Sequence, residues 1–155
     1  IYQKYDSLRL GNNALEFARI VVSSIQEVPY TWILPESCFD ANNQQEINRS
    51  GYACLGNIKK YGIQSPLEFM ANQKGDCDTK ALIIYSILKH FNYDVCILIS
   101  AAYEHALLGI NIPASGKFKM HQGKKYYAWE TTVKGLDIGQ LSPMQSNMNL
   151  WEVAM

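Results

Sequence analysis

The stretch KGDCDTK, residues 74 to 80, places Cys77 between two acidic residues just before the apolar run ALIIYSIL. A cysteine acts as a nucleophile in its thiolate form, and the free N–H groups and positive dipole end of a helix N-terminus favour that anion. Asp76 and Asp78 oppose thiolate formation, so a reactive Cys77 would need a cationic partner, for which an imidazolium is the usual choice. The motif therefore raises the hypothesis of a nucleophilic thiol at the start of a helix.

The chain has three histidines that could supply this imidazolium. His90 would lie on the same helix as Cys77 but roughly 20 Å along its axis, at about 1.5 Å per residue, which is too far. His121 falls in the polar stretch GKFKMHQGKK, which is typical of a solvated loop. His105 opens the segment HALLGINI, and a strand there could reach Cys77 if the edge of the sheet packs over the helix start. His105 is the candidate partner, with a plain structural role for either residue as the alternative.

The helices that would position these side chains follow from apolar spacing and capping. Apolar residues recur at helical spacing from residue 13 to 26, which predicts a first helix. Ser65 and Pro66 are typical of an N-cap and a first helical position, and predict a short helix ending near residue 72. The run from residue 81 to 91, directly after the cysteine, is apolar on nearly every face and predicts a helix in the middle of the core.

Three β-like segments come after that helix, at residues 94–101, 105–112 and 125–131. Residues 32–62 are rich in Asn, Gln, Pro and Gly with weak periodicity, and predict a long irregular crossover with short helical turns. Helices followed by strands indicate an α+β domain. We expect a central helix, with the cysteine at its N-terminus, packed on an antiparallel sheet.

Composition limits the classes of partner. The chain has 155 residues, of which 48% are hydrophobic and 18% charged, and we expect one domain over residues 1–155. Fourteen basic residues balance fourteen acidic ones, so no net field favours nucleic acid or an anionic membrane. The longest apolar runs fall short of the roughly 18 to 20 residues of a membrane-spanning helix, and we expect no membrane insertion. The chain begins at Ile1 rather than Met, so we expect it to belong to a longer protein.

The four cysteines form no CxxC pair, and no histidine stands at a metal-ligand spacing or acidic residue in an EF-hand pattern. We therefore expect no metal and no cofactor. Cys96, in YDVCILIS, has the pattern of a buried small hydrophobe. Cys38 and Cys54 flank the polar segment FDANNQQEINRSGYA and could form a loop-closing disulfide if the protein is exported.

Taken together, these motifs resemble a known group of enzymes. GDC, an apolar helix, a histidine that opens a strand and the later segment YYAWETT are similar to the transglutaminase-like cysteine enzyme superfamily, which shares a papain-type core. VSSIQEVPYT is similar to the VQxIPY segment of bacterial transglutaminase-like cysteine peptidases, and YGIQSPLEFMANQKGDC to their passage before the cysteine. The resemblance covers roughly residues 15 to 140.

The resemblance implies a role for each matching residue. Cys77 would be the nucleophile, His105 the general base and acid, and Glu130, in WETT, the carboxylate that orients the imidazole. Many members have Asp at this place, and the longer arm of Glu can make the same bond. Asp137, in GLDIG, is the second candidate for the acid, although its position beyond the strand is typical of a turn.

Three further residues come from the same comparison. Gln26 matches an oxyanion-hole amide that would act beside the main-chain N–H of Cys77, with a polar helix end as the alternative. Trp129 and Tyr30 are candidate walls of a substrate cleft, with plain core packing as the alternative.

The implied activity is acyl transfer from a peptide or carboxamide bond through an acyl-enzyme, with a protein or peptide as substrate. We favour hydrolysis by a peptidase or amidase, because bacterial members are commonly assigned that role. Protein cross-linking by a transglutaminase and a noncatalytic protein-binding module of the same fold are the alternatives. The identity of the substrate and the oligomeric state stay open.

Overall fold

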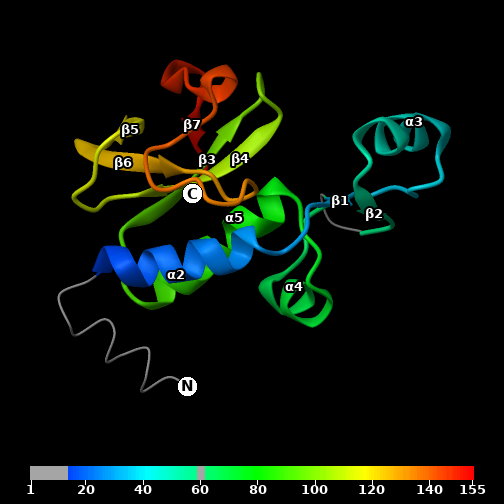
Figure 1. The fold of residues 1–155 in the computed structure, drawn as a ribbon, viewed down its shortest axis with the longest axis horizontal. Helices are drawn as coiled ribbons and strands as arrows, with labels where there is room; N and C mark the ends of the chain where they lie inside the picture. Colours follow the sequence, from blue (N-terminus) through cyan, green and yellow to red (C-terminus); the bar gives the residue numbers. More distant parts are fainter. Residues whose placement is uncertain (1–13, 59–61) are drawn as a thin grey trace.

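A computed structural model describes residues 14–58 and 62–155, and in it a five-stranded antiparallel sheet packs against helices in an α+β arrangement (Figure 1). The strand order is β5-β6-β4-β3-β7, and every pairing in this sheet is antiparallel. The strands are β3 (Val95–Ser100), β4 (His105–Ile110), β5 (Phe118–His121), β6 (Lys124–Trp129) and β7 (Glu152–Val153). The expected fold class is confirmed at this level.

Both faces of the central strands are covered. Neighbouring residues on a strand point to opposite faces, and Leu107 and Leu108 of β4 accordingly join different apolar clusters. Leu108 packs with residues of the helices, whereas Leu107 packs with Trp151 from the C-terminal segment. This explains why β4 is buried along almost its whole length.

Two helices form the layer on one face of the sheet. They are α2 (Ala14–Gln26) and α5 (Cys77–His90), and α5 contacts α2 as well as β3 and β4. The carboxylate of Asp76 accepts a hydrogen bond from the main-chain N–H of Thr79 and so caps the start of α5. The central helix begins at Cys77, as the sequence indicates. No helix among the described residues has both the length and the apolar character to span a membrane.

A shorter helix, α4 (Pro66–Asn72), precedes α5. It begins with a capping box, in which Ser65 and Glu68 exchange hydrogen bonds between side chains and main-chain N–H groups. This cap fixes the start of the helix that leads to the loop before Cys77.

The segment before α4 is more regular than the sequence predicts. It contains α3 (Ala41–Ser50) and a parallel pair of strands, β1 (Thr31–Ile33) and β2 (Ala53–Leu55). The prediction of an irregular crossover over residues 32–62 is wrong for α3, whose periodicity is weak because the helix buries no residue. A disulfide joins Cys38 and Cys54, as the sequence allowed. In Figure 1 this part lies at one end of the molecule, away from the five-stranded sheet.

Candidate active site

The thiol of Cys77 lies at the first position of α5, where the residue is 7% exposed. Because a helix begins here, the main-chain N–H of Cys77 has no acceptor within the helix. The preceding Gly75 packs against Phe69, and an added Cβ would stand 2.9 Å from the aromatic ring. The glycine of the GDC motif therefore allows α4 and the start of α5 to approach closely.

His105 is the first residue of β4, and it meets the carboxylate of Glu130 at the end of β6. Its Nε2 lies 3.0 Å from Oε2 and 3.3 Å from Oε1 of that carboxylate. Thr132 donates two further hydrogen bonds to Oε1, from its main-chain N–H at 2.8 Å and its hydroxyl at 2.7 Å. Glu130 is 1% exposed and is held in one orientation by these contacts.

The other side of the imidazole meets the thiol. The thiol of Cys77 lies close enough to the imidazole of His105 to raise the pKa of that ring. Each ring nitrogen has a single bonding direction in the plane of the ring, and Nε2 is used by Glu130, so Nδ1 is left for the sulfur. The structure thus brings together the thiol, the imidazole and the carboxylate in one line of contacts.

His105 and Glu130 each favour the charged form of the other. Burial lowers the pKa of His105, but hydrogen bonds to Cys77 and Glu130 and the negative charge of Glu130 outweigh burial and raise it to about 10. Burial likewise raises the pKa of Glu130, yet its hydrogen bonds from His105 and Thr132 hold that pKa below the ordinary value. At neutral pH, the imidazole is therefore an imidazolium and the acid a carboxylate.

Tyr30 places a hydroxyl at the sulfur. Its hydroxyl lies close enough to Cys77 for that side chain to raise the pKa of the phenol, and the residue is partly exposed. A β-bridge to Gly75 positions Tyr30, and the N–H of Thr31 donates to the Gly75 carbonyl at 3.1 Å. Burial and the negative charges of Cys77 and Asp76 raise the pKa of Tyr30, so the phenol stays protonated and can donate.

Gln26 does not face the thiol. Its amide nitrogen donates to the carbonyls of Glu130 at 2.7 Å and Leu136 at 2.9 Å, and its oxygen accepts from the N–H of Gly135 at 3.3 Å. Both amide hydrogens are used, so none is left for an oxyanion near Cys77. The contacts favour the alternative of a buried polar residue, because Gln26 ties the end of α2 to the chain that follows β6.

Trp129 is also directed elsewhere. It is 2% exposed, belongs to the apolar core beneath the helices and donates its indole N–H to Leu136 at 3.2 Å. These contacts favour the alternative of plain core packing, since a side chain this deeply buried offers little surface to a substrate.

Two other candidates from the sequence lie away from the site. Asp137 pairs with Arg19 of α2 at 2.8 Å and is thereby bound to another partner. His121 ends β5 rather than lying in a loop.

The sequence does not predict that Lys80 and Thr132 lie near the site. Lys80 is completely buried one turn after Cys77, and a charged residue inside an otherwise apolar helix was the signal that could have revealed it. Thr132 donates hydrogen bonds to the Glu130 carboxylate, and nothing in its local sequence marks that role.

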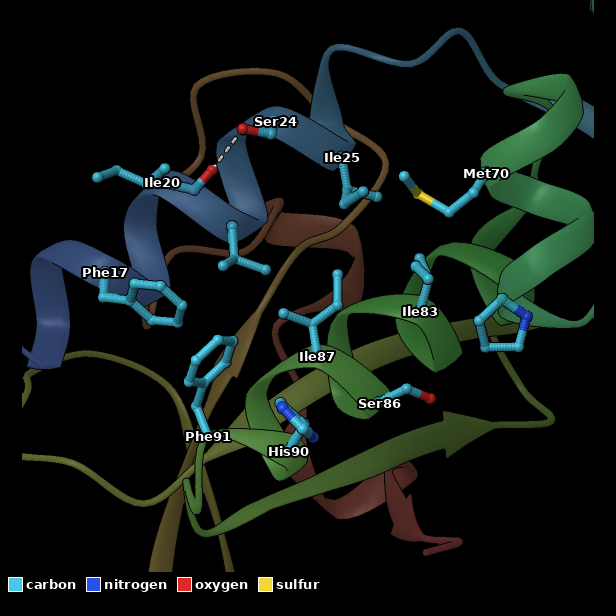
Figure 2. Close-up of a pocket in the computed structure, with 12 residues that line it drawn as sticks. Phe17, Ile20, Ser24, Ile25, Met70, Ile83, Ser86, Ile87, His90 and Phe91 are labelled. Atoms are coloured by element: carbon cyan, nitrogen blue, oxygen red, sulfur yellow. Dashed lines mark hydrogen bonds between the residues drawn. The ribbon is translucent and has the colours of Figure 1, made fainter. Parts of the chain in front are cut away.

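A separate apolar cavity of about 550 Å³ lies between α2, α4 and α5. Figure 2 shows side chains from the three helices, among them Ile25, Met70 and Ile87, directed toward this space. Neither Cys77 nor His105 lines it, so the cavity is distinct from the cluster of reactive groups. Within residues 14–58 and 62–155, no group of three or more potential metal ligands is present.

No protein-family model matches the chain, and neither a curated protein nor a solved structure matches it.

Proposed function

We propose that this protein is a thiol-dependent acyl-transfer enzyme that acts on peptide or carboxamide bonds and preferentially transfers the acyl group to water. The proposal includes a papain-like core of the transglutaminase-like type, in which α5 presents the nucleophile to a sheet that carries the base. The observation that supports it best is the position of His105, which contacts Cys77 on one side and Glu130 on the other.

The first half of the reaction uses these contacts directly. The sulfur of Cys77 attacks the carbonyl carbon, the S–C bond forms, and the carbonyl oxygen takes the negative charge. The imidazolium of His105 gives its proton to the departing amine as the C–N bond breaks, which leaves a thioester on Cys77. Glu130 keeps the imidazole oriented throughout.

The second half restores the enzyme. A water molecule attacks the thioester, His105 accepts a proton from it, and the C–S bond breaks to release a carboxylic acid and the thiolate. The main-chain N–H of Cys77 and the hydroxyl of Tyr30 are the donors available for the oxyanion. Tyr30 thus takes the role that the sequence comparison gave to Gln26.

The disulfide supports a location for this chemistry. Disulfides persist in oxidising compartments and are rare in reducing ones. The Cys38–Cys54 bond is therefore consistent with an exported protein, which would meet peptide substrates outside the cytoplasm.

A noncatalytic binding module is the second candidate, because the thiol is only 7% exposed and Tyr30 lies against it.

Alkylation by iodoacetamide at pH 5.5 to 8 separates the two candidates. Cys96 is a matched internal control, since it is the other free cysteine and burial raises its pKa to about 12. The enzyme requires rapid alkylation of Cys77 well below pH 8.5, the region of an ordinary thiol, and a strong decrease in His105→Ala.

The choice of acyl acceptor needs a second assay. Cleavage of a peptide library and incorporation of a dansyl amine are followed side by side, with Cys77→Ala as the blank. Cysteine-dependent cleavage supports hydrolysis, and cysteine-dependent amine incorporation supports a transglutaminase. Slow alkylation with neither activity would favour the binding module.

A further inference from the structure

One charged side chain in the core has no role in the mechanism described above. Lys80 of α5 is 0% exposed. Its ammonium donates a hydrogen bond to the main-chain carbonyl of Val28. Burying an ammonium carries a desolvation cost that a single carbonyl compensates only partly. A residue such as methionine would fill a similar volume without that cost, so the charge calls for an explanation.

Two charged groups, Glu130 and Lys134, act on the pKa of Lys80. Burial lowers the pKa of Lys80 to about 8, the negative charge of Glu130 acts in the opposite direction, and the positive charge of Lys134 adds to the lowering. Lys134 is itself paired with Glu27 at 2.7 Å, on the surface. Lys80 is therefore a buried cation whose charge interacts with the Glu130 carboxylate.

The hydrogen bond to Val28 has a geometric consequence. Val28 lies two residues before Tyr30, in the short segment that leaves α2 and reaches the bridge with Gly75. Lys80 ties this segment to α5, one helical turn after Cys77. One ammonium thus connects the element that carries the sulfur with the segment that carries the hydroxyl beside it.

We infer that Lys80 is a positioning residue of the thiol site, which fixes the Tyr30 segment against α5 and supplies a buried positive charge that favours the ionised form of Glu130. This inference rests on the proposed function, and it assigns Lys80 no contact with substrate. It explains why a costly buried charge is placed one turn from the nucleophile.

The experiment compares Lys80→Met with Lys89→Met, a matched change at an exposed lysine of the same helix. The rate of Cys77 alkylation is measured from pH 4 to 9, together with the thermal midpoint. We expect Lys80→Met to slow alkylation at pH 6 by about 10- to 100-fold, a range taken by analogy with the loss of residues that orient metal-binding side chains. Its acid limb should move to higher pH, because nearby protons bind more tightly once a positive charge is removed. Lys89→Met should match the wild type.

Two results would overturn the role inferred for Lys80. A profile for Lys80→Met that matches the wild type, or a lower thermal midpoint with an unmoved acid limb, overturns the inference. If Lys80→Met does not fold, the pH titration of the Lys80 side-chain ¹³Cε resonance in the wild type decides instead. The inference requires a charged ammonium where alkylation is fast, and a neutral amine there would refute it.

Failure of the proposed function has a different signature. In that case, wild-type Cys77 reacts no faster than an ordinary thiol and no Cys77-dependent turnover is found. The displacement of the acid limb between wild type and Lys80→Met can still be measured on a slow alkylation, so the role of Lys80 is judged separately.

Discussion

Nε2 of His105 lies 3.0 Å from Oε2 of Glu130, although 25 residues separate them in the chain. The contact joins the start of β4 to the residue that follows β6, two neighbouring strands of one sheet. It leaves the other edge of the imidazole for Cys77, and Cys77 and Glu130 together raise the pKa of the ring.

Glu130→Gln should lower the Cys77-dependent turnover by about 10²- to 10⁴-fold, because the imidazolium loses the carboxylate that orients and stabilises it. Turnover and alkylation are measured against pH. Glu104→Gln, at the exposed acid beside His105, is the matched control and should retain activity. Equal activity of Glu130→Gln and the control would remove Glu130 from the triad.

The His105–Glu130 pair should give stability a defined pH dependence. His105 has its ordinary pKa of 6.5 when unfolded and about 10 when folded, so its contribution is complete below pH 6.5 and is lost as the pH rises through 10. Glu130, with a folded pKa below its ordinary 4.5, contributes above pH 4.5 and loses that contribution as the pH falls through its folded pKa. The pair should therefore stabilise most between pH 4.5 and 6.5.

Urea unfolding at pH 5.5, 7.5 and 9.5 measures this dependence. The difference in unfolding free energy between wild type and His105→Gln should shrink steadily as the pH rises. His90→Gln controls for the loss of an exposed imidazole. A difference that stays constant from pH 5.5 to 9.5 would contradict the assignment.

Tyr30→Phe should lower kcat by about 10²- to 10³-fold with little change in thermal stability, because it removes one donor to the oxyanion. Tyr52→Phe is the control, because the ring of Tyr52 lies 4.8 Å from that of Tyr30. It also removes a phenol hydroxyl, but from the neighbouring tyrosine. An unchanged kcat in Tyr30→Phe would leave the tyrosine as a wall of the site only.

Gln26→Leu should act on stability first. The change removes the amide donor of the Glu130 carbonyl, whereas the Leu136 carbonyl keeps the indole N–H of Trp129. A buried unsatisfied group costs about 1–3 kcal/mol. Chemical denaturation measures the loss of unfolding free energy. A stable Gln26→Leu protein with strongly reduced kcat would restore the oxyanion role that the contacts argue against.

The disulfide should stabilise its own segment. Cys38 and Cys54 are 16 residues apart, and closing a loop of about this length contributes about 3 kcal/mol in the chain-entropy account. Replacing both by serine should speed hydrogen exchange in α3 much more than in α5, with Cys77 alkylation nearly unchanged. Equal acceleration in both helices would mean that the segment and the core unfold together.

The elements that the sequence predicted well are those with a strong local signal. The helix at residues 14–26 and the central helix have apolar faces, and α4 has Ser65 with Pro66 at its start. By contrast, α3 buries no residue, and the strands β1, β2 and β7 are two or three residues long. Such short strands depend on partners distant in sequence, which local periodicity does not reveal.

The same distinction applies to the site. The sequence could predict the pairing of Cys77 with His105, because each stands at the start of an element and a reactive thiolate requires a cationic partner. The directions of Gln26 and Trp129 could not be read in this way, because they are set by the chain at Gly135 and Leu136, which folds back after β6. Local sequence names the residue types, and tertiary packing decides where their polar atoms point.

The thiol, the imidazole and the carboxylate come from α5, β4 and the end of β6, in that order along the chain. During synthesis, a ribosome therefore releases the sulfur well before the acid that completes the set. A nascent polypeptide carries an unassisted cysteine until residue 130 has emerged and the sheet has formed. The order of the elements thereby delays the meeting of the three groups until β6 and the residue after it have been made.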